Sequence, residues 1–253
     1  MAPSRSLRHW RIILLIVFIL VPVANYLPIL LDVSQDRFTN GTDTRIDAAG
    51  YAFSIWGVIF TGMLLFAFFQ LRSADDSPYL RRALRFLVVA GLASIAFVPI
   101  SFGANYLWGV VDLLWHLVAL IGAYLALRHH EAERGSPAYG WTWFAPSMYL
   151  GWISAATVIS TALALQQLGI TFEPPTAIAI ATGLVIVLTL LGIYLGLRRD
   201  GIYAFTVAWA LVGVAVEQQD AALIFWAASA GATCLAILGI SGLLSRRDFF
   251  YAT

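Results

Sequence analysis

Two ionisable residues inside an apolar stretch are the best candidates for chemistry in this sequence. Asp112 and His116 lie four positions apart within residues 107–127, so they share one face of a helix. Ionisable side chains within a membrane span are costly and are rarely idle. The pair is able to relay protons, to contact a ligand, or to offer an axial nitrogen to a haem-like molecule. The alternative is a structural pair in which each group satisfies the other inside a helical bundle.

Two tryptophans extend the same stretch. Trp108 and Trp115 are seven positions apart, or about two helical turns. Indole rings at this spacing serve either for packing between helices or for holding a planar ligand. The sequence contains nine tryptophans, and this abundance adds weight to the ligand interpretation.

The composition places these residues in a membrane protein. Of the 253 residues, 60% are hydrophobic and 11% are charged, and apolar runs extend along the whole chain. This pattern is typical of a polytopic membrane protein. We predict an all-α membrane helical bundle forming a single membrane domain over residues 1–253. Eight spans are expected, of which the seventh is the shortest: residues 12–31, 50–70, 83–102, 107–127, 143–165, 177–197, 202–216 and 221–244.

The basic residues predict the orientation. Every basic residue is arginine and the net charge is +1, so no strong field attracts nucleic acid and lysine Schiff-base chemistry is excluded. Thirteen of the fifteen arginines fall on one side of the eight-span pattern, whereas Arg37 and Arg45 fall on the other. The positive-inside rule then places both termini in the cytoplasm. We expect an integral protein of the bacterial cytoplasmic membrane.

The loops carry less information. Residues 32–47, on the outside, could form a lid over a pocket or a solvated connector. The inside stretch of residues 128–140, which includes His129 and His130, is interpreted as a solvated polar connector rather than a surface metal site. The sequence shows no nucleophile with an obvious base, no metal motif and no phosphate loop, so we do not expect an enzyme.

Two further motifs are aromatic. Tyr51, Phe53 and Trp56 open the second expected span, while Tyr149 and Trp152 lie in the fifth. Around Trp152 the small residues Gly151, Ser154, Ala155 and Ala156 permit close approach of another helix or of a ligand.

Together these motifs resemble the TspO/MBR family, the tryptophan-rich sensory proteins related to the mitochondrial translocator protein. In that family the second span opens with a similar aromatic pattern, here Phe53 and Trp56. The fifth span carries W-x-S-x-A-T, matched by Trp152, Ser154, Ala156 and Thr157. The resemblance covers residues 10–165, which leaves three additional spans over residues 177–244.

The sequence also departs from the family pattern. The Pro-Pro pair ahead of the second span is absent, and Ser160 stands where the family has asparagine in the fifth span. The third span offers Pro99, Ser101 and Asn105 in place of L-N-x-x-W. An altered ligand pocket follows from these differences.

The resemblance implies binding of a hydrophobic, roughly planar small molecule, such as a porphyrin, haem or sterol-like compound, for sensing, transport or regulation. It implies that Tyr51, Phe53, Trp56, Tyr149 and Trp152 converge on one cleft; the other expected ligand contacts are Trp108, Asp112, Trp115 and His116. The expected partners are the lipid bilayer and the small molecule, and a homodimer is an open alternative. A proton-coupled secondary transporter using Asp112 and His116 is the rival interpretation, and a membrane enzyme acting on lipid is a third.

Overall fold

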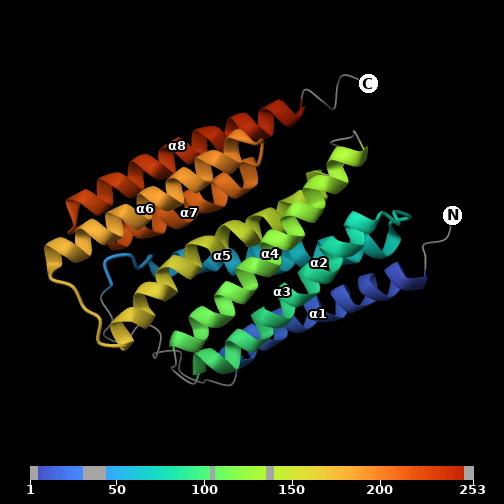
Figure 1. Ribbon diagram of the computed structural model, residues 1–253, viewed down its shortest axis with the longest axis horizontal. Coiled ribbons are helices and arrows are strands. Elements are labelled where there is room, and N and C mark those ends of the chain that lie inside the picture. Colours follow the sequence, from blue (N-terminus) through green and yellow to red (C-terminus); the bar gives the residue numbers. More distant parts are fainter. Residues whose placement is uncertain (1–4, 31–43, 103–105, 135–139, 248–253) are drawn as a thin grey trace. The chain divides into compact units, whose positions relative to one another are not determined.

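The computed structural model describes residues 5–30, 44–102, 106–134 and 140–247, and these are helical throughout apart from short connections (Figure 1). The outside loop proposed as a lid lies almost entirely outside the described residues. The elements are α1 (Arg5–Leu30), η1 (Gly50–Ser54), α2 (Ile55–Arg72), α3 (Pro78–Phe102), α4 (Tyr106–Arg134), α5 (Gly140–Gln167), α6 (Pro174–Leu197), α7 (Gly201–Glu217) and α8 (Ala222–Arg247).

The helix lengths confirm the polytopic all-α bundle. Within the described residues, seven helices are long and apolar enough to cross a membrane. The exception is α7, whose 17 residues extend about 26 Å, slightly less than a hydrocarbon core of about 30 Å. Large apolar side chains are exposed along α1 and α6, for example Ile16, Leu20, Val187 and Leu190. Such surfaces suit lipid, which solvates them as well as a protein core does.

The chain divides into two compact units. Unit 1 comprises Met1–Asn40 and Trp56–Leu150, and unit 2 comprises Gly41–Ile55 and Gly151–Thr253. The division into residues 10–165 and 177–244 rests on the family resemblance and stays a prediction.

Unit 1 is organised around α3, which packs against both α1 and α4. Its core contains Leu14 and Phe18 from α1 together with Leu84 and Leu87 from α3, all of them fully buried. Apolar residues at these spacings form the continuous stripe that lets one helix face another. This packing fixes the polar residues of α3 and α4 relative to each other.

Unit 2 is organised around α8, which runs alongside α6 and α7 (Figure 1). A tight turn joins α6 to α7, in which Arg199 adopts a positive φ of 66°. Asp200 follows as the N-cap, and its side chain accepts a hydrogen bond from the Tyr203 backbone N–H. This capping satisfies a backbone donor that would otherwise lack a partner at the helix start.

The segment of residues 44–54 attaches to α7 within unit 2. The backbone N–H of Ala49 donates to the Gly213 carbonyl at 3.0 Å, and the Trp209 indole donates to the Ala52 carbonyl at 2.9 Å. At the end of α7, Arg45 forms a 2.6 Å ion pair with Asp220. These contacts hold η1 against the helix.

Candidate functional site

The polar face of α4 is buried inside unit 1. His116 is 1% exposed and Asp112 is 9% exposed, although both lie within the apolar span of Leu107–His130. A charge directed toward lipid at this depth costs at least about 2.5–3.5 kcal/mol. Burial against the neighbouring helices reduces that exposure.

His116 pairs with a residue on another helix rather than with Asp112. Its Nε2 lies 2.5 Å from the hydroxyl of Tyr149 on α5, and the two rings meet edge to face. The Ser94 side chain on α3 also hydrogen-bonds the Tyr149 hydroxyl. Three helices of unit 1 therefore contribute to one buried polar cluster, made of Ser94, His116 and Tyr149.

Two buried atoms beside this cluster have no hydrogen-bond partner. They are Oδ2 of Asp112 and Nδ1 of His116, one helical turn apart on α4. A buried polar group without a partner costs about 1–3 kcal/mol. Both atoms are therefore positioned to gain from a ligand or from bound water.

Asp112 lies in a groove between α3 and α4. The groove has a volume of about 450 Å³ and is lined by Ile100, Trp108, Val111, Asp112, Leu114, Trp115 and Val118. The Trp108 and Trp115 side chains are 60% and 62% exposed, so the indole rings border the groove on its open side. The spacing of 108, 112 and 115 places the carboxyl between the two rings along the helix.

A haem-like ligand coordinated by His116 does not fit this arrangement. His116 does not line the groove, and its Nε2 is engaged by Tyr149. Its remaining nitrogen belongs to a ring that is 1% exposed. Among the described residues, no group of three or more His, Cys, Asp or Glu side chains could hold a metal ion.

The aromatic motifs of the second and fifth spans meet in pairs. In unit 1, Trp56 lies 5.9 Å from Tyr149 between ring centroids. In unit 2, Phe53 lies 5.5 Å from Trp152. Because Trp152 is fully buried and these rings contact each other directly, they act in packing within each unit. That all five predicted rings line one ligand cleft stays a prediction.

Tyr51 has a different partner, which the sequence did not suggest. Its ring packs at 5.6 Å against Trp209 of α7 in unit 2. Also in unit 2, the Tyr203 hydroxyl donates to Ser154 at 3.0 Å. Ser154 of the fifth-span motif therefore serves the α5–α7 contact.

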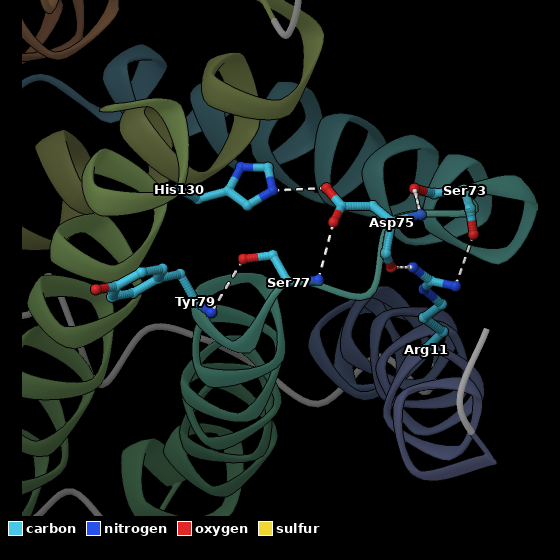
Figure 2. A network of polar contacts seen from close by, with 6 residues as sticks. All are labelled: Arg11, Ser73, Asp75, Ser77, Tyr79 and His130. Carbon is cyan, nitrogen blue, oxygen red and sulfur yellow. Dashed lines mark hydrogen bonds and ion pairs between the residues drawn. The ribbon is translucent and has the colours of Figure 1, made fainter. Parts of the chain in front are cut away.

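A second buried network lies at the end of unit 1 where α2 joins α3 (Figure 2). His130 of α4 approaches Asp75 with a 2.6 Å distance between Nε2 and Oδ2. Arg11 of α1 donates to the carbonyl oxygens of Ser73 and Asp75. The interpretation of residues 128–140 as a solvated connector is wrong for His130, which is 5% exposed, because the carboxylate of Asp75 gives the imidazole a buried partner.

Turn chemistry around Asp75 is the signal that could have revealed this network. Asp75 Oδ1 accepts from the Ser77 backbone N–H at 2.9 Å, and Ser77 Oγ accepts from the Tyr79 N–H at 3.2 Å. Asp and Ser at two-residue spacing ahead of Pro78 are typical of a helix start. Nothing in the sequence indicates that Arg11 and His130 meet there.

The comparisons with known proteins agree with the fold and the motifs. The sequence model of a family described as "TSPO-like protein" matches residues 11–241. This match includes α6, α7 and most of α8 as well as the first five helices. The comparisons with curated proteins and with solved structures give no match. Because the family match covers most of the chain, this integral membrane protein belongs to the TSPO-like family.

Proposed function

We propose that this protein binds a hydrophobic, roughly planar small molecule that reaches the groove of α3 and α4 from the bilayer. The single observation that carries the proposal is the pair of exposed indoles flanking Asp112 in that groove. Tryptophan rings hold flat apolar molecules well. Ligand sites are commonly apolar concavities with few polar groups, and here the carboxyl of Asp112 supplies the polar group. Porphyrins and sterol-like compounds are the ligand kinds that the family resemblance implies.

The experiment is a titration of the purified full-length chain in detergent with a porphyrin that has no acidic side chains and, separately, with a sterol. Binding should quench tryptophan fluorescence without any pH gradient. Trp108→Phe and Trp115→Phe should each weaken binding about twofold to tenfold, because each removes part of one indole surface.

Trp226→Phe is the matched control, since Trp226 is 68% exposed on α8 and does not line the groove. It should bind as the unchanged protein does. Saturable quenching that is equally insensitive to all three substitutions would contradict the groove as the site.

The rival candidate is a proton-coupled secondary transporter, favoured by the unpartnered Nδ1 of His116 beside the unpartnered Oδ2 of Asp112. Proton paths in membrane proteins are built from such intramembrane groups. Ser94, Tyr149 and His116 offer a short line of hydrogen bonds along which a proton could pass.

Reconstitution in liposomes separates the candidates. A transporter should accumulate its substrate only when a pH gradient is imposed, and Tyr149→Phe should abolish that dependence because the hydroxyl link is lost. Tyr194→Phe, at an exposed ring on α6, is the control. Uptake that is insensitive to the gradient would remove the transporter interpretation and leave ligand binding.

A further inference from the structure

Besides its aromatic sides, the groove of α3 and α4 contains one carboxyl group, that of Asp112. Among the described residues that line it, Asp112 is the only ionisable one. Oδ2 of this residue is buried without a hydrogen-bond partner, although the residue lines the groove. Because this oxygen has almost no accessible surface, the Asp112 side chain must rotate to bring it to the groove, where an N–H donated by an occupant gives it the partner it lacks.

No arginine on the two groove helices is close enough to serve instead, and His116, one turn from Asp112 on α4, does not line the groove. On α4 the nearest arginine along the helix is Arg128, sixteen residues from Asp112, or about 24 Å. On α3 the groove residue Ile100 is fifteen residues from Arg85, or about 22 Å. A ligand carboxylate in the groove would therefore meet Asp112 with no counter-charge from either helix.

The flanking rings favour the same ligand chemistry. A protonated amine is attracted to the faces of indole rings, with tryptophan the best of the aromatic side chains. Trp108 and Trp115 stand one turn on either side of Asp112. An apolar ligand bearing one amine can therefore place its nitrogen at the carboxyl and its hydrocarbon part along the apolar side chains.

A groove in unit 2 provides a contrast. It lies between α6 and α8, has a volume of about 340 Å³, and is lined by Ile186, Thr189, Leu190, Ala227, Ala230, Gly231 and Cys234. Its hydroxyl group, on Thr189, already donates to the Val185 carbonyl at 2.8 Å. None of the residues that line this groove carries a carboxyl group. We therefore do not expect it to select amines, although it too is an apolar groove.

We propose that the groove of α3 and α4 selects hydrophobic amines, with Asp112 accepting the ligand N–H and Trp108 and Trp115 enclosing the apolar body. This inference rests on the proposed function and narrows its ligand class. It predicts discrimination against ligands that carry carboxylates, including haem and porphyrins with acidic side chains.

The test uses the full-length chain in nanodiscs of uncharged phosphatidylcholine, with binding to empty nanodiscs subtracted. Three anthracene probes share one ring system and differ in one group: a methylamine, a methyl alcohol and a carboxylate. Energy transfer from tryptophan to bound anthracene reports binding. The amine should bind about tenfold or more tightly than the alcohol, and the carboxylate should bind most weakly, because a hydrogen bond to a charged group is worth about 1.5–3 kcal/mol.

Variants of Asp112 test whether its carboxylate causes the preference for the amine probe. Asp112→Asn should reduce amine affinity to that of the alcohol while leaving alcohol affinity within about twofold. Asp112→Glu should restore part of the preference, and Asp220→Asn, at an exposed turn outside the groove, should leave the affinities of the three probes unchanged. The ranking of the three probes on the unchanged protein tests the inference even if Asp112→Asn fails to fold.

The outcomes separate the two proposals. Equal binding of amine and alcohol, unchanged in Asp112→Asn but weakened by Trp108→Phe and Trp115→Phe, would overturn amine selection and retain the groove as a site. Absence of binding by all three probes would overturn both. If the two tryptophan substitutions instead change the oligomeric state and no probe binds, a second copy of the chain occupies the groove and the inference is wrong.

Discussion

Asp75 uses both of its carboxylate oxygens inside unit 1. One pairs with His130 and the other accepts the backbone N–H of Ser77, while the Asp75 carbonyl accepts from Arg11. The residue is 7% exposed. A buried carboxylate with this many partners positions the whole connection between α2 and α3, since removing one contact leaves another polar group without its match.

We expect Asp75→Asn to lower the free energy of unfolding by about 1–3 kcal/mol, because the amide weakens the contacts of both oxygens. Thermal or denaturant unfolding in detergent measures this. Asp76→Asn is the matched control, because the neighbouring Asp76 is partly exposed and its ion pair with Arg81 is long, at 3.5 Å. If both variants lose the same free energy of unfolding, the buried contacts of Asp75 contribute no more to stability than the exposed ion pair of Asp76.

At this scale the sequence predicted candidates but not their partners. The four-residue spacing of Asp112 and His116 indicates a shared helical face, and both side chains are buried. The contact between His116 and Tyr149 joins positions 33 residues apart, so it depends on how three helices pack. His130 looked solvated because its neighbours in sequence are polar, whereas its partner Asp75 comes from a different connection.

The contact between α7 and α8 depends on glycine. A methyl group added to Gly201 would lie 2.6 Å from the carbonyl oxygen of Gly239. Backbone cannot move aside as a flexible side chain can. The two helices therefore approach at a distance that only glycine allows at this position.

Gly201→Ala should destabilise the protein by about 1–3 kcal/mol through this overpacking. Gly183→Ala on α6 is the control, because a methyl group there would have no atom within 4 Å, and alanine favours a helix by up to about 1 kcal/mol. Unfolding of both variants side by side is the measurement. A Gly201→Ala protein as stable as Gly183→Ala would refute the close approach.

The attachment of residues 44–54 at the end of α7, within unit 2, includes a titratable ion pair between Arg45 and Asp220. The hydrogen bond from Arg45 lowers the pKa of Asp220 below its ordinary value. A lowered folded-state pKa stabilises the folded form above the unfolded-state pKa of about 3.9, and that stabilisation is lost as the pH falls through the folded-state value.

The measurement is NMR titration of the Asp220 carboxyl in the unchanged protein and in Arg45→Gln. In Arg45→Gln the pKa should return toward the ordinary range for aspartate, and the stabilisation should disappear at every pH. An unchanged titration would mean that the ion pair does not persist in solution.

For α3 and α4, the expected spans match one end of the helix and miss the other, more polar end. The expected span of residues 107–127 begins one residue inside α4 but stops short of its end at Arg134. The span of residues 83–102 ends where α3 ends but misses its start at Pro78. Hydropathy detects only the part of a helix that suits lipid. The backbone hydrogen bonds that continue it into water leave no such signal.

The contacts within each unit are consistent with one topology for the whole molecule. Arg11, Asp75 and His130 meet in unit 1, and the eight-span pattern places all three on the cytoplasmic side. Arg45 and Asp220 meet in unit 2, and the same pattern places both outside. Each contact therefore joins residues that the pattern assigns to one side of the membrane, with α7 counted as a span despite its length.

We therefore predict that both termini are cytoplasmic. A reporter that is active only in the cytoplasm should function when fused after Thr253. A second reporter, active only outside the cytoplasm, should function when inserted after Asp220. If the cytoplasmic reporter is inactive after Thr253 and the outside reporter is active there instead, the predicted orientation and number of spans are both wrong.

The Asp75 network also has a consequence for how the chain is made. Synthesis proceeds from the N-terminus, so Arg11 is already present when the connection between α2 and α3 leaves the ribosome. His130 follows 55 residues after Asp75, once the whole apolar part of α4 has been translated. During that interval the carboxylate lacks its imidazole partner and stays hydrated. We therefore expect closure of this end of unit 1 to be coupled to insertion of the fourth helix, so that a nascent chain arrested before α4 keeps Asp75 accessible to water.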